Sequence, residues 1–278
     1  MHEIPFQIQN CRGNAVWGDV RFQTSMSALP VVVMCHGFKG FKDWGPFPAW
    51  GRMLAKAGFV SILFNFSFNG VTPEHPQTFS RFDHFADNTF TRELDDLDAV
   101  ICAIVDETLG APVDSSRIGL MGHSRGGGTA ILQAGRDARI GALTTWSAVS
   151  GFIERFSPTQ IADFEGQGFS EILNARTGQV MRLNRTLYDD ALAHRAEIFI
   201  LGAAAKIHIP WLIVHAHDDE SVPFAEAEML HSASNGAVIY KASGGHTFCG
   251  RHPFECNIPN QLSSVFERTK QFLIQTLT

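Results

Sequence analysis

Short apolar segments alternate with longer amphipathic segments along most of this chain. Pro30–Cys35, Phe59–Asn65 and Pro210–Ala216 are almost wholly apolar, which is typical of strands buried on both faces. Pro48–Ala57 and Thr91–Leu109 instead repeat apolar residues every three or four positions, as one face of a helix does. Strands that alternate with helices predict right-handed crossovers and a mostly parallel sheet with helices on both faces.

The two ends of the chain complete this pattern. Ile4–Asn10 and Ala15–Phe22 flank a polar turn and predict an antiparallel hairpin at the N-terminus. Further strands and helices are predicted in the order of the chain: strands at Arg117–Gly122, Ile140–Ser147 and Ala237–Ala242, and helices at Gly126–Ala134, Pro223–Ser234 and Gln261–Leu277. In the helix at Thr91–Leu109, the acidic residues Glu93 and Asp96 are expected to face mostly away from the apolar stripe.

The alternation breaks in one place, between Ser150 and Lys206. That stretch contains a hairpin turn at Arg176–Gln179 and helical pieces near Tyr188–Ala193 and Ile198–Ala204. We predict a cap inserted at about residues 151–206 over the carboxyl edge of the sheet, within a single domain that spans residues 1–278. Ligands bind at that edge in open α/β sheets, so the cap is expected to shape a substrate pocket.

Composition excludes several classes of protein. The chain has 278 residues, 45% of them hydrophobic and 18% charged, which is ordinary for a globular protein. Its 22 basic and 28 acidic residues give a net charge of −6 without a basic tract, which argues against a nucleic-acid partner. No apolar run is long enough to cross a membrane, and no secretory signal is visible, so we expect no membrane partner. The sequence leaves the oligomeric state open, with a homodimer as one option.

The five cysteines are scattered and form no CxxC motif, which favours reduced thiols and a cytoplasmic location. Cys35 and Cys102 lie among apolar residues and are expected to be buried. A local pair between Cys249 and Cys256 is the less favoured alternative.

The most specific motif is Gly122-His123-Ser124-Arg125-Gly126, which fits G-x-S-x-G. A predicted strand leads directly into it and a helix of small residues leads out, as the motif requires. The serine must occupy a sharp turn that raises its hydroxyl above the sheet. Positions two before and two after it must therefore lack bulk, and both are glycine.

With this motif in this context, residues 25–150 and 208–278 resemble the α/β-hydrolase family. The resemblance implies an α/β-hydrolase fold, with Ser124 as nucleophile and the chain order serine, aspartate, histidine. His36–Phe38, Asn65–Asn69 and the short cap resemble the feruloyl or cinnamoyl esterases and the dienelactone-hydrolase-like branch. No cofactor is implied, because acyl transfer by this mechanism needs only water.

The resemblance also selects the acid and the base. A strand ends just before His217-Asp218-Asp219-Glu220-Ser221-Val222-Pro223, which resembles the D-x-x-V-P segment of the family and selects Asp219, with Asp218 as the reserve. After the next strand, Gly245-His246-Thr247-Phe248 resembles the Gly-His-x-Phe loop, with His246 as the base. A base is needed because a serine hydroxyl is a weak nucleophile at neutral pH, and the acid orients that base.

Acyl transfer also needs two N–H donors at the developing oxyanion. The backbone N–H of Arg125, which follows the nucleophile, is one expected donor. His36-Gly37-Phe38-Lys39-Gly40 resembles the H-G-x-x-G loop of the family and supplies the second, the N–H of Phe38. His36 is expected to brace this loop. The guanidinium of Arg125 could meet a substrate carboxylate, but pairing with a loop acid is preferred.

Two other patterns admit alternative interpretations. His215-Ala216-His217-Asp218-Asp219-Glu220 nearly matches H-x-H-x-D-H, a dinuclear zinc motif like that of metallo-β-lactamases, but the last histidine is missing. Phenylalanines gather between residues 68 and 90, where they either line an apolar acyl or aryl pocket or simply pack the loop down.

Taken together, the residues predict a serine hydrolase that cleaves small acyl or aryl esters through an acyl-enzyme. A peptidase like the prolyl oligopeptidases is the alternative within enzymes. The alternative of another class is a binding protein without enzymatic activity on a hydrolase fold.

Overall fold

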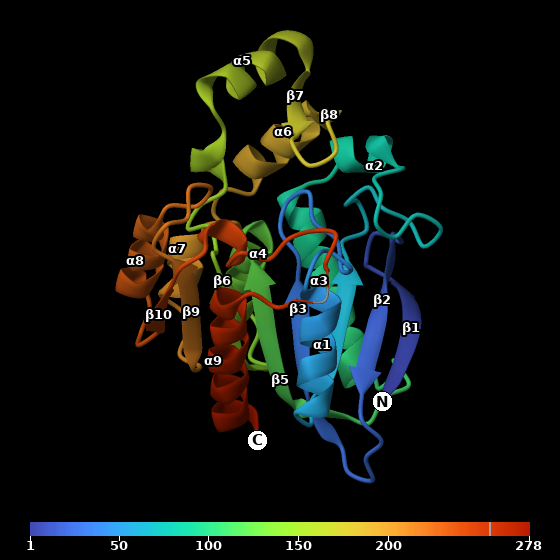
Figure 1. Cartoon of the computed structure of the whole chain (residues 1–278). Coiled ribbons are helices and arrows are strands. Elements are labelled where there is room, and N and C mark those ends of the chain that lie inside the picture. Colours follow the sequence, from blue (N-terminus) through green and yellow to red (C-terminus); the bar gives the residue numbers. More distant parts are fainter. Residues whose placement is uncertain (256) are drawn as a thin grey trace.

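Eight strands form one twisted sheet at the centre of the molecule (Figure 1). A computed structural model describes residues 1–255 and 257–278. The strands of the sheet are β1 (His2–Gln9), β2 (Ala15–Phe22), β3 (Leu29–Cys35), β4 (Val60–Asn65), β5 (Val113–His123), β6 (Ile140–Trp146), β9 (Trp211–Ala216) and β10 (Val238–Ala242). Their order is β1-β2-β4-β3-β5-β6-β9-β10, antiparallel for the first two strands and parallel from β4 onward. The predicted parallel sheet with an N-terminal hairpin is confirmed.

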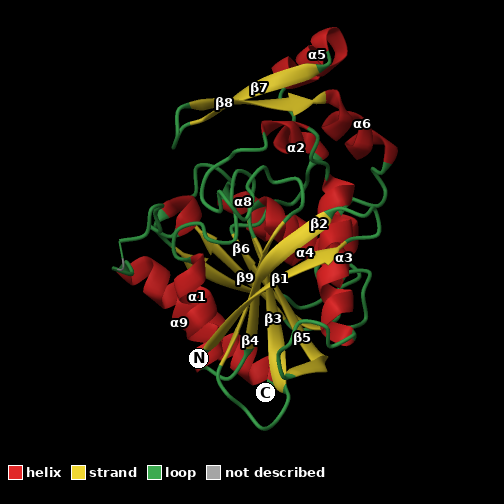
Figure 2. Ribbon diagram, turned by 90° about the vertical axis from the view of Figure 1, so that its right-hand side faces the viewer, coloured by secondary structure: helices red, strands yellow, loops and turns green. Residues whose placement is uncertain are grey.

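Helices cover both faces of this sheet, so the molecule has three layers (Figure 2). One face carries α1 (Phe47–Lys56) and α9 (Asn260–Leu277), and the other carries α3 (Phe90–Val105), α4 (Arg125–Ala134) and α8 (Phe224–Ala233). The central strands are apolar throughout because each face is buried: Val31 and Val33 of β3 pack in one core, and Val32 and Met34 in the other.

The chain between β6 and β9 leaves the sheet and folds above the carboxyl ends of the parallel strands (Figure 1). It contains η1 (Ile153–Arg155), α5 (Pro158–Gln167), β7 (Phe169–Asn174), β8 (Gln179–Asn184), α6 (Arg185–Ala193) and α7 (Ile200–Ala204). β7 and β8 pair only with each other, as the predicted turn between them requires. The sequence analysis missed α5, which begins with a capping box between Ser157 and Gln160.

Two predictions about other parts of the chain were wrong. The helix predicted to end at Leu109 ends at Val105, because Glu107 turns into the left-handed region and the Thr108 N–H bonds back to the carbonyl of Ala103. The phenylalanine-rich stretch between residues 68 and 90 also contains a short helix, α2 (Phe82–Ala86), which the sequence analysis did not predict. Cys35 is buried as expected, but Cys102 is partly exposed. Cys256, and with it the alternative Cys249–Cys256 pair, lies outside the described residues.

The closing helix, α9, is amphipathic as predicted. Leu262, Phe266 and Leu273 are buried against the sheet and against Trp50 and Trp146 of the same core. No helix in the described part of the chain is both long enough and apolar enough to span a bilayer.

The buried side of α9 yields a stability prediction. Leu273→Ala should lower the free energy of unfolding by about 2–5 kcal/mol, because a fully buried leucine leaves a cavity when truncated. Ile274→Ala is the matched control, since Ile274 is 38% exposed on the same turn and should change this free energy far less. Urea denaturation of both variants measures the difference, and equal losses would contradict the assigned orientation of α9.

Candidate active site

Ser124 lies on a sharp turn between β5 and α4, as the sequence motif predicts. Its backbone has φ 56° and ψ −121°, a left-handed conformation that a non-glycine residue rarely adopts. The Ser124 N–H donates to the carbonyl of Trp146 at 2.9 Å, which ties the turn to the end of the neighbouring strand β6. The surrounding hydrogen bonds therefore hold a strained residue at the carboxyl edge of the sheet.

The two flanking glycines are sterically required. A Cβ at Gly122 would lie 2.3 Å from the carbonyl oxygen of Gly126, and a Cβ at Gly126 would lie 2.3 Å from the carbonyl oxygen of His36. Both obstacles are backbone atoms, which cannot swing aside as a side chain can. The turn and the loop after β3 are thus in direct contact.

Asp219 and His246 come together although 27 residues separate them. His246 Nδ1 lies 2.8 Å from Asp219 Oδ2. Burial by itself would raise the pKa of Asp219, but hydrogen bonds from His246 and from the Val222 N–H outweigh it and lower this pKa to about 2. Asp219 is therefore ionised at neutral pH and accepts the Nδ1–H of His246, which leaves Nε2 free to act as a base.

The other oxygen of Asp219 is held by the backbone of its own loop. Asp219 Oδ1 accepts the N–H groups of Ser221 and Val222, both at 2.9 Å. His215 lies beneath this loop, fully buried, and its Nε2–H donates to the Val222 carbonyl at 2.8 Å. The orientation of the carboxylate is thus fixed before any substrate binds.

His123 connects the serine turn to the loop that carries His246. His123 Nε2 lies 3.0 Å from the carbonyl oxygen of His246, and the two imidazole rings are 4.8 Å apart. Within the described residues the Ser124 hydroxyl forms no hydrogen bond to His246, a contact that in free enzymes is often long and tightens when substrate binds. The structure therefore brings His246 beside the immediate neighbour of Ser124.

Two backbone N–H groups lie free at the position expected for an oxyanion hole. Neither the Phe38 N–H nor the Arg125 N–H has a hydrogen-bond acceptor in the part of the chain described here. The loop of Phe38 passes so close to Ser124 that a Cβ on Gly37 would lie 3.0 Å from Ser124 Cβ. The Arg125 N–H also begins α4, where the helix dipole favours negative charge.

His36 braces the Phe38 loop through both of its ring nitrogens. Nδ1–H donates to the Gly37 carbonyl at 2.9 Å, and Nε2 accepts from the Phe66 N–H at 3.4 Å and from Asn69 Nδ2 at 3.3 Å. Burial lowers the pKa of His36 to about 4, so the ring is neutral and can donate on one side while it accepts on the other.

The Arg125 side chain pairs with Glu93. The two are 3.0 Å apart and almost wholly buried, and Glu93 also accepts from Asn88 at 2.8 Å. The acid belongs to the first turn of α3, not to a loop, and both Glu93 and Asp96 are buried, contrary to prediction. The sequence did contain a signal for the burial of Glu93. Glu93 lies three residues after Phe90 and four before Leu97, so it falls on the apolar face of the helix.

The histidines of the alternative zinc motif lie in different surroundings. His215 is buried at the end of β9, whereas His217 is exposed and its Nδ1–H donates to the Ala242 carbonyl at 2.8 Å. Among residues 1–255 and 257–278, no group of three or more His, Cys, Asp or Glu side chains is arranged to hold a metal ion.

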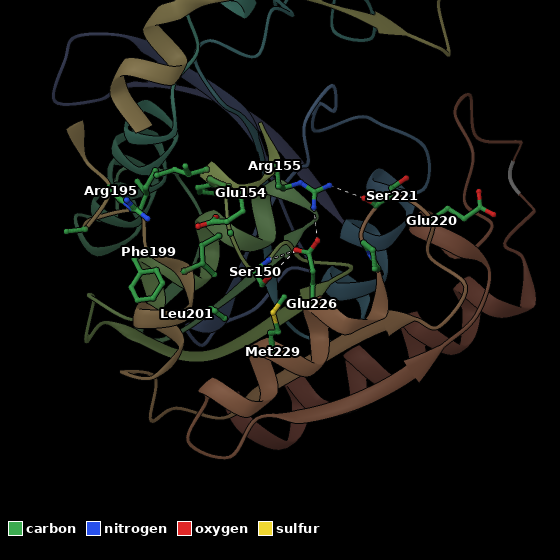
Figure 3. Close-up of a pocket in the computed structure, with 17 residues that line it drawn as sticks. Ser150, Glu154, Arg155, Arg195, Phe199, Leu201, Glu220, Ser221, Glu226 and Met229 are labelled. Atoms are coloured by element: carbon green, nitrogen blue, oxygen red, sulfur yellow. Dashed lines mark hydrogen bonds and ion pairs between the residues drawn. The ribbon is translucent and has the colours of Figure 1, made fainter. Parts of the chain in front are cut away.

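A cavity of about 960 Å³ opens where the inserted segment joins the sheet (Figure 3). It is lined by residues after β6, by the chain around α7 and by the N-terminal half of α8, and an ion pair of 2.7 Å between Arg155 and Glu226 crosses it. Glu220 and Ser221 bring the loop of Asp219 to its rim. The side chains of Ser124, Asp219 and His246 are not part of its wall.

Most rings of the aromatic stretch pack the loop down. Phe79, Phe85 and Phe90 are buried, and Phe90 stacks on Phe152 with ring centres 4.1 Å apart. Phe82 is the exception within the stretch, with 42% of the residue exposed. Phe38, which precedes the stretch in the chain, is 37% exposed beside Ser124 and stacks on Phe85. An aromatic pocket would therefore have the exposed rings of Phe38 and Phe82 to draw on, and the buried rings serve to pack the loop.

Comparison with known proteins identifies the family. The BD-FAE family model matches residues 23–233, and the chain therefore belongs to the BD-FAE family. Membership of this family supports ester hydrolysis as the class of reaction. A search of curated proteins found no match to the chain.

Solved structures share the fold over nearly the whole chain. Est1E from Butyrivibrio proteoclasticus has a TM-score of 0.69 and 21% sequence identity, with 98% of each chain covered. The esterase domain of a Rhodothermus marinus protein gives a TM-score of 0.66 at 16% identity and covers 100% of both chains. An esterase from Pyrococcus furiosus gives 0.64 at 14% identity, covering 100% of this chain and 92% of the other. The molecule has the α/β-hydrolase fold.

The contact between the serine turn and the loop after β3 predicts a steric effect. Gly126→Ala should lower the free energy of unfolding by about 1–3 kcal/mol, because the added methyl group meets rigid backbone at Cys35 and His36. Gly166→Ala within α5 is the control: nothing lies within 4 Å of the new Cβ, and stability should stay equal or rise. Thermal and urea unfolding measure both variants, and a neutral Gly126→Ala would refute the contact.

Proposed function

We propose that this protein is a serine carboxylesterase that hydrolyses small acyl or aryl esters through an acyl-enzyme. Ser124 is the nucleophile, His246 the base and Asp219 the residue that orients it. The N–H groups of Phe38 and Arg125 form the oxyanion hole. The observation that carries this proposal is the 2.8 Å contact between His246 Nδ1 and an ionised Asp219, beside a serine held in a left-handed turn.

The proposed reaction has two halves. Ser124 Oγ attacks the ester carbonyl as its proton passes to His246 Nε2, and the negative oxygen accepts the two free N–H groups. His246 then protonates the leaving alcohol, and the acyl-enzyme remains. Water attacks the acyl carbon while His246 takes its proton, and collapse returns that proton to Ser124 and releases the carboxylic acid.

The substrate class is proposed from the surroundings of Ser124. The exposed ring of Phe38 offers an apolar surface next to the proposed oxyanion hole, where an acyl or aryl group can pack. Est1E, which shares the fold, has been solved with ferulic acid bound, and a phenolic acid of this kind suits an aromatic wall. We further propose that residues 151–206 act as a cap over this edge within a single domain.

Replacement of the nucleophile tests the proposal directly. Ser124→Ala should lose nearly all turnover of p-nitrophenyl acetate and butyrate, a fall of about 10³-fold or more, and should no longer react with a fluorophosphonate probe. Ser243→Ala is the matched control, because Ser243 lies at the same edge of the sheet and its hydroxyl has no hydrogen-bond partner in the described chain. Retained activity in Ser124→Ala would overturn the proposal.

A panel of ester and amide substrates distinguishes an esterase from a peptidase and from a binding protein without enzymatic activity. Acetyl, butyryl and feruloyl esters should be cleaved, and aminoacyl amides of matched size should not. Faster cleavage of the amides would support a peptidase instead. A folded wild-type protein that neither cleaves any ester nor reacts with the fluorophosphonate would support a binding protein without enzymatic activity.

A further inference from the structure

We propose that Asp218 and His123 are positioning residues that fix the histidine loop, residues 244–248, so that His246 faces Ser124. This inference rests on the proposed function and extends it. Neither residue takes part in the chemical steps. Both bind the backbone of the loop, whereas Asp219 binds the imidazole itself.

Asp218 holds the start of the histidine loop. Its Oδ1 accepts the N–H of Gly244 at 3.0 Å and the N–H of Gly245 at 3.1 Å, and its Oδ2 lies 3.1 Å from the Gly244 nitrogen. These N–H groups converge because both glycines adopt left-handed backbones, with φ 99° and 65°. The same hydrogen bonds lower the pKa of Asp218, so the acceptor is ionised at neutral pH.

His123 holds the loop from the opposite side, at His246 itself. A carbonyl oxygen only accepts, so the 3.0 Å contact requires that His123 Nε2 carry the proton. Burial lowers the pKa of His123 to about 3, and the ring therefore stays neutral with a single N–H. Because His123 precedes Ser124 in the chain, this one hydrogen bond couples the position of the base to the position of the nucleophile.

The two adjacent aspartates thus have different tasks. Asp219 is buried and binds the ring of His246, whereas Asp218 is half exposed and binds the backbone of the two residues before that histidine. A bond to Nδ1 alone leaves the imidazole free to shift with its loop. Phe248, buried against Trp146, anchors the far end of the loop. Asp218 and His123 supply the anchors at its start and centre.

Loss of either anchor should misplace the base without changing the surface that binds substrate. We expect Asp218→Ala and His123→Leu to lower kcat by about 10- to 100-fold with KM unchanged, because a displacement of about 1 Å in a reacting group costs that much. The rate at which a fluorophosphonate modifies Ser124 should fall in parallel, since that reaction also needs His246 as base.

Conservative variants separate positioning from a general loss of stability. His123→Gln keeps a neutral N–H donor and should recover part of the activity that His123→Leu loses. Asp218→Asn keeps one acceptor oxygen and should lie between wild type and Asp218→Ala. The control is Asp114→Ala at the opposite end of the sheet, where the carboxylate accepts the Ser116 N–H at 3.0 Å. This variant should leave kcat unchanged.

The outcomes distinguish this inference from the proposed function. If Ser124→Ala is inactive but folded Asp218→Ala has wild-type kcat, the role of Asp218 is wrong and the serine mechanism stands. A rise in KM at constant kcat would assign Asp218 to substrate binding instead and would overturn its positioning role. If His123→Leu fails to fold, the His123→Gln variant decides: a kcat within about 10-fold of wild type supports a donor role, and a larger loss in a folded variant refutes it. If Ser124→Ala keeps its activity, the proposed function fails first.

Discussion

The close packing of backbone against backbone at the carboxyl edge of β3 and β5 is the constraint on which the candidate site depends. Gly126 lies against the carbonyl oxygen of His36, and Gly37 lies against Ser124. A Cβ at Gly126 would lie 2.3 Å from the His36 carbonyl oxygen and would force the two segments apart, and a Cβ at Gly37 would lie 3.0 Å from Ser124 Cβ. This contact holds the backbone of Phe38 and Arg125 close to Ser124, which is the arrangement that the proposed oxyanion hole requires.

Buried histidines around the site serve as hydrogen-bonding groups. His36 and His123 are held neutral by burial, and each uses a protonated nitrogen to hold a carbonyl of a functional loop. Asp219 is held in the opposite way: hydrogen bonds keep it charged despite its burial. Burial and hydrogen bonding thus fix the protonation states of His36, His123 and Asp219. The hydrogen bonds of the candidate site are in place before substrate binds.

The inserted segment between β6 and β9 packs against the main hydrophobic core and shares that core with the sheet. Phe164 and Met181 of this segment belong to the same buried cluster as the strands, and Phe152 joins that cluster through its stack on Phe90. Through Phe90, which also lies under the Arg125 guanidinium, the segment reaches the residue that follows Ser124. Substitutions in the insertion can therefore alter the surroundings of Ser124 through packing alone.

The sequence determined the mostly parallel sheet with its N-terminal hairpin, the serine turn and the segments that carry Asp219 and His246. Those features depend on local patterns: apolar runs set buried strands, and glycines set the turn. The pairing of Asp219 rather than Asp218 with His246 followed from a family resemblance and agrees with the geometry. The burial of Glu93 against Arg125, the contacts of Asp218 and His123 with the histidine loop, and the true end of α3 became visible only in the tertiary structure. They depend on contacts between segments that are far apart in the sequence. A polar side chain on the apolar face of a helix does not by itself show whether the folded chain places a hydrogen-bonding partner beside it.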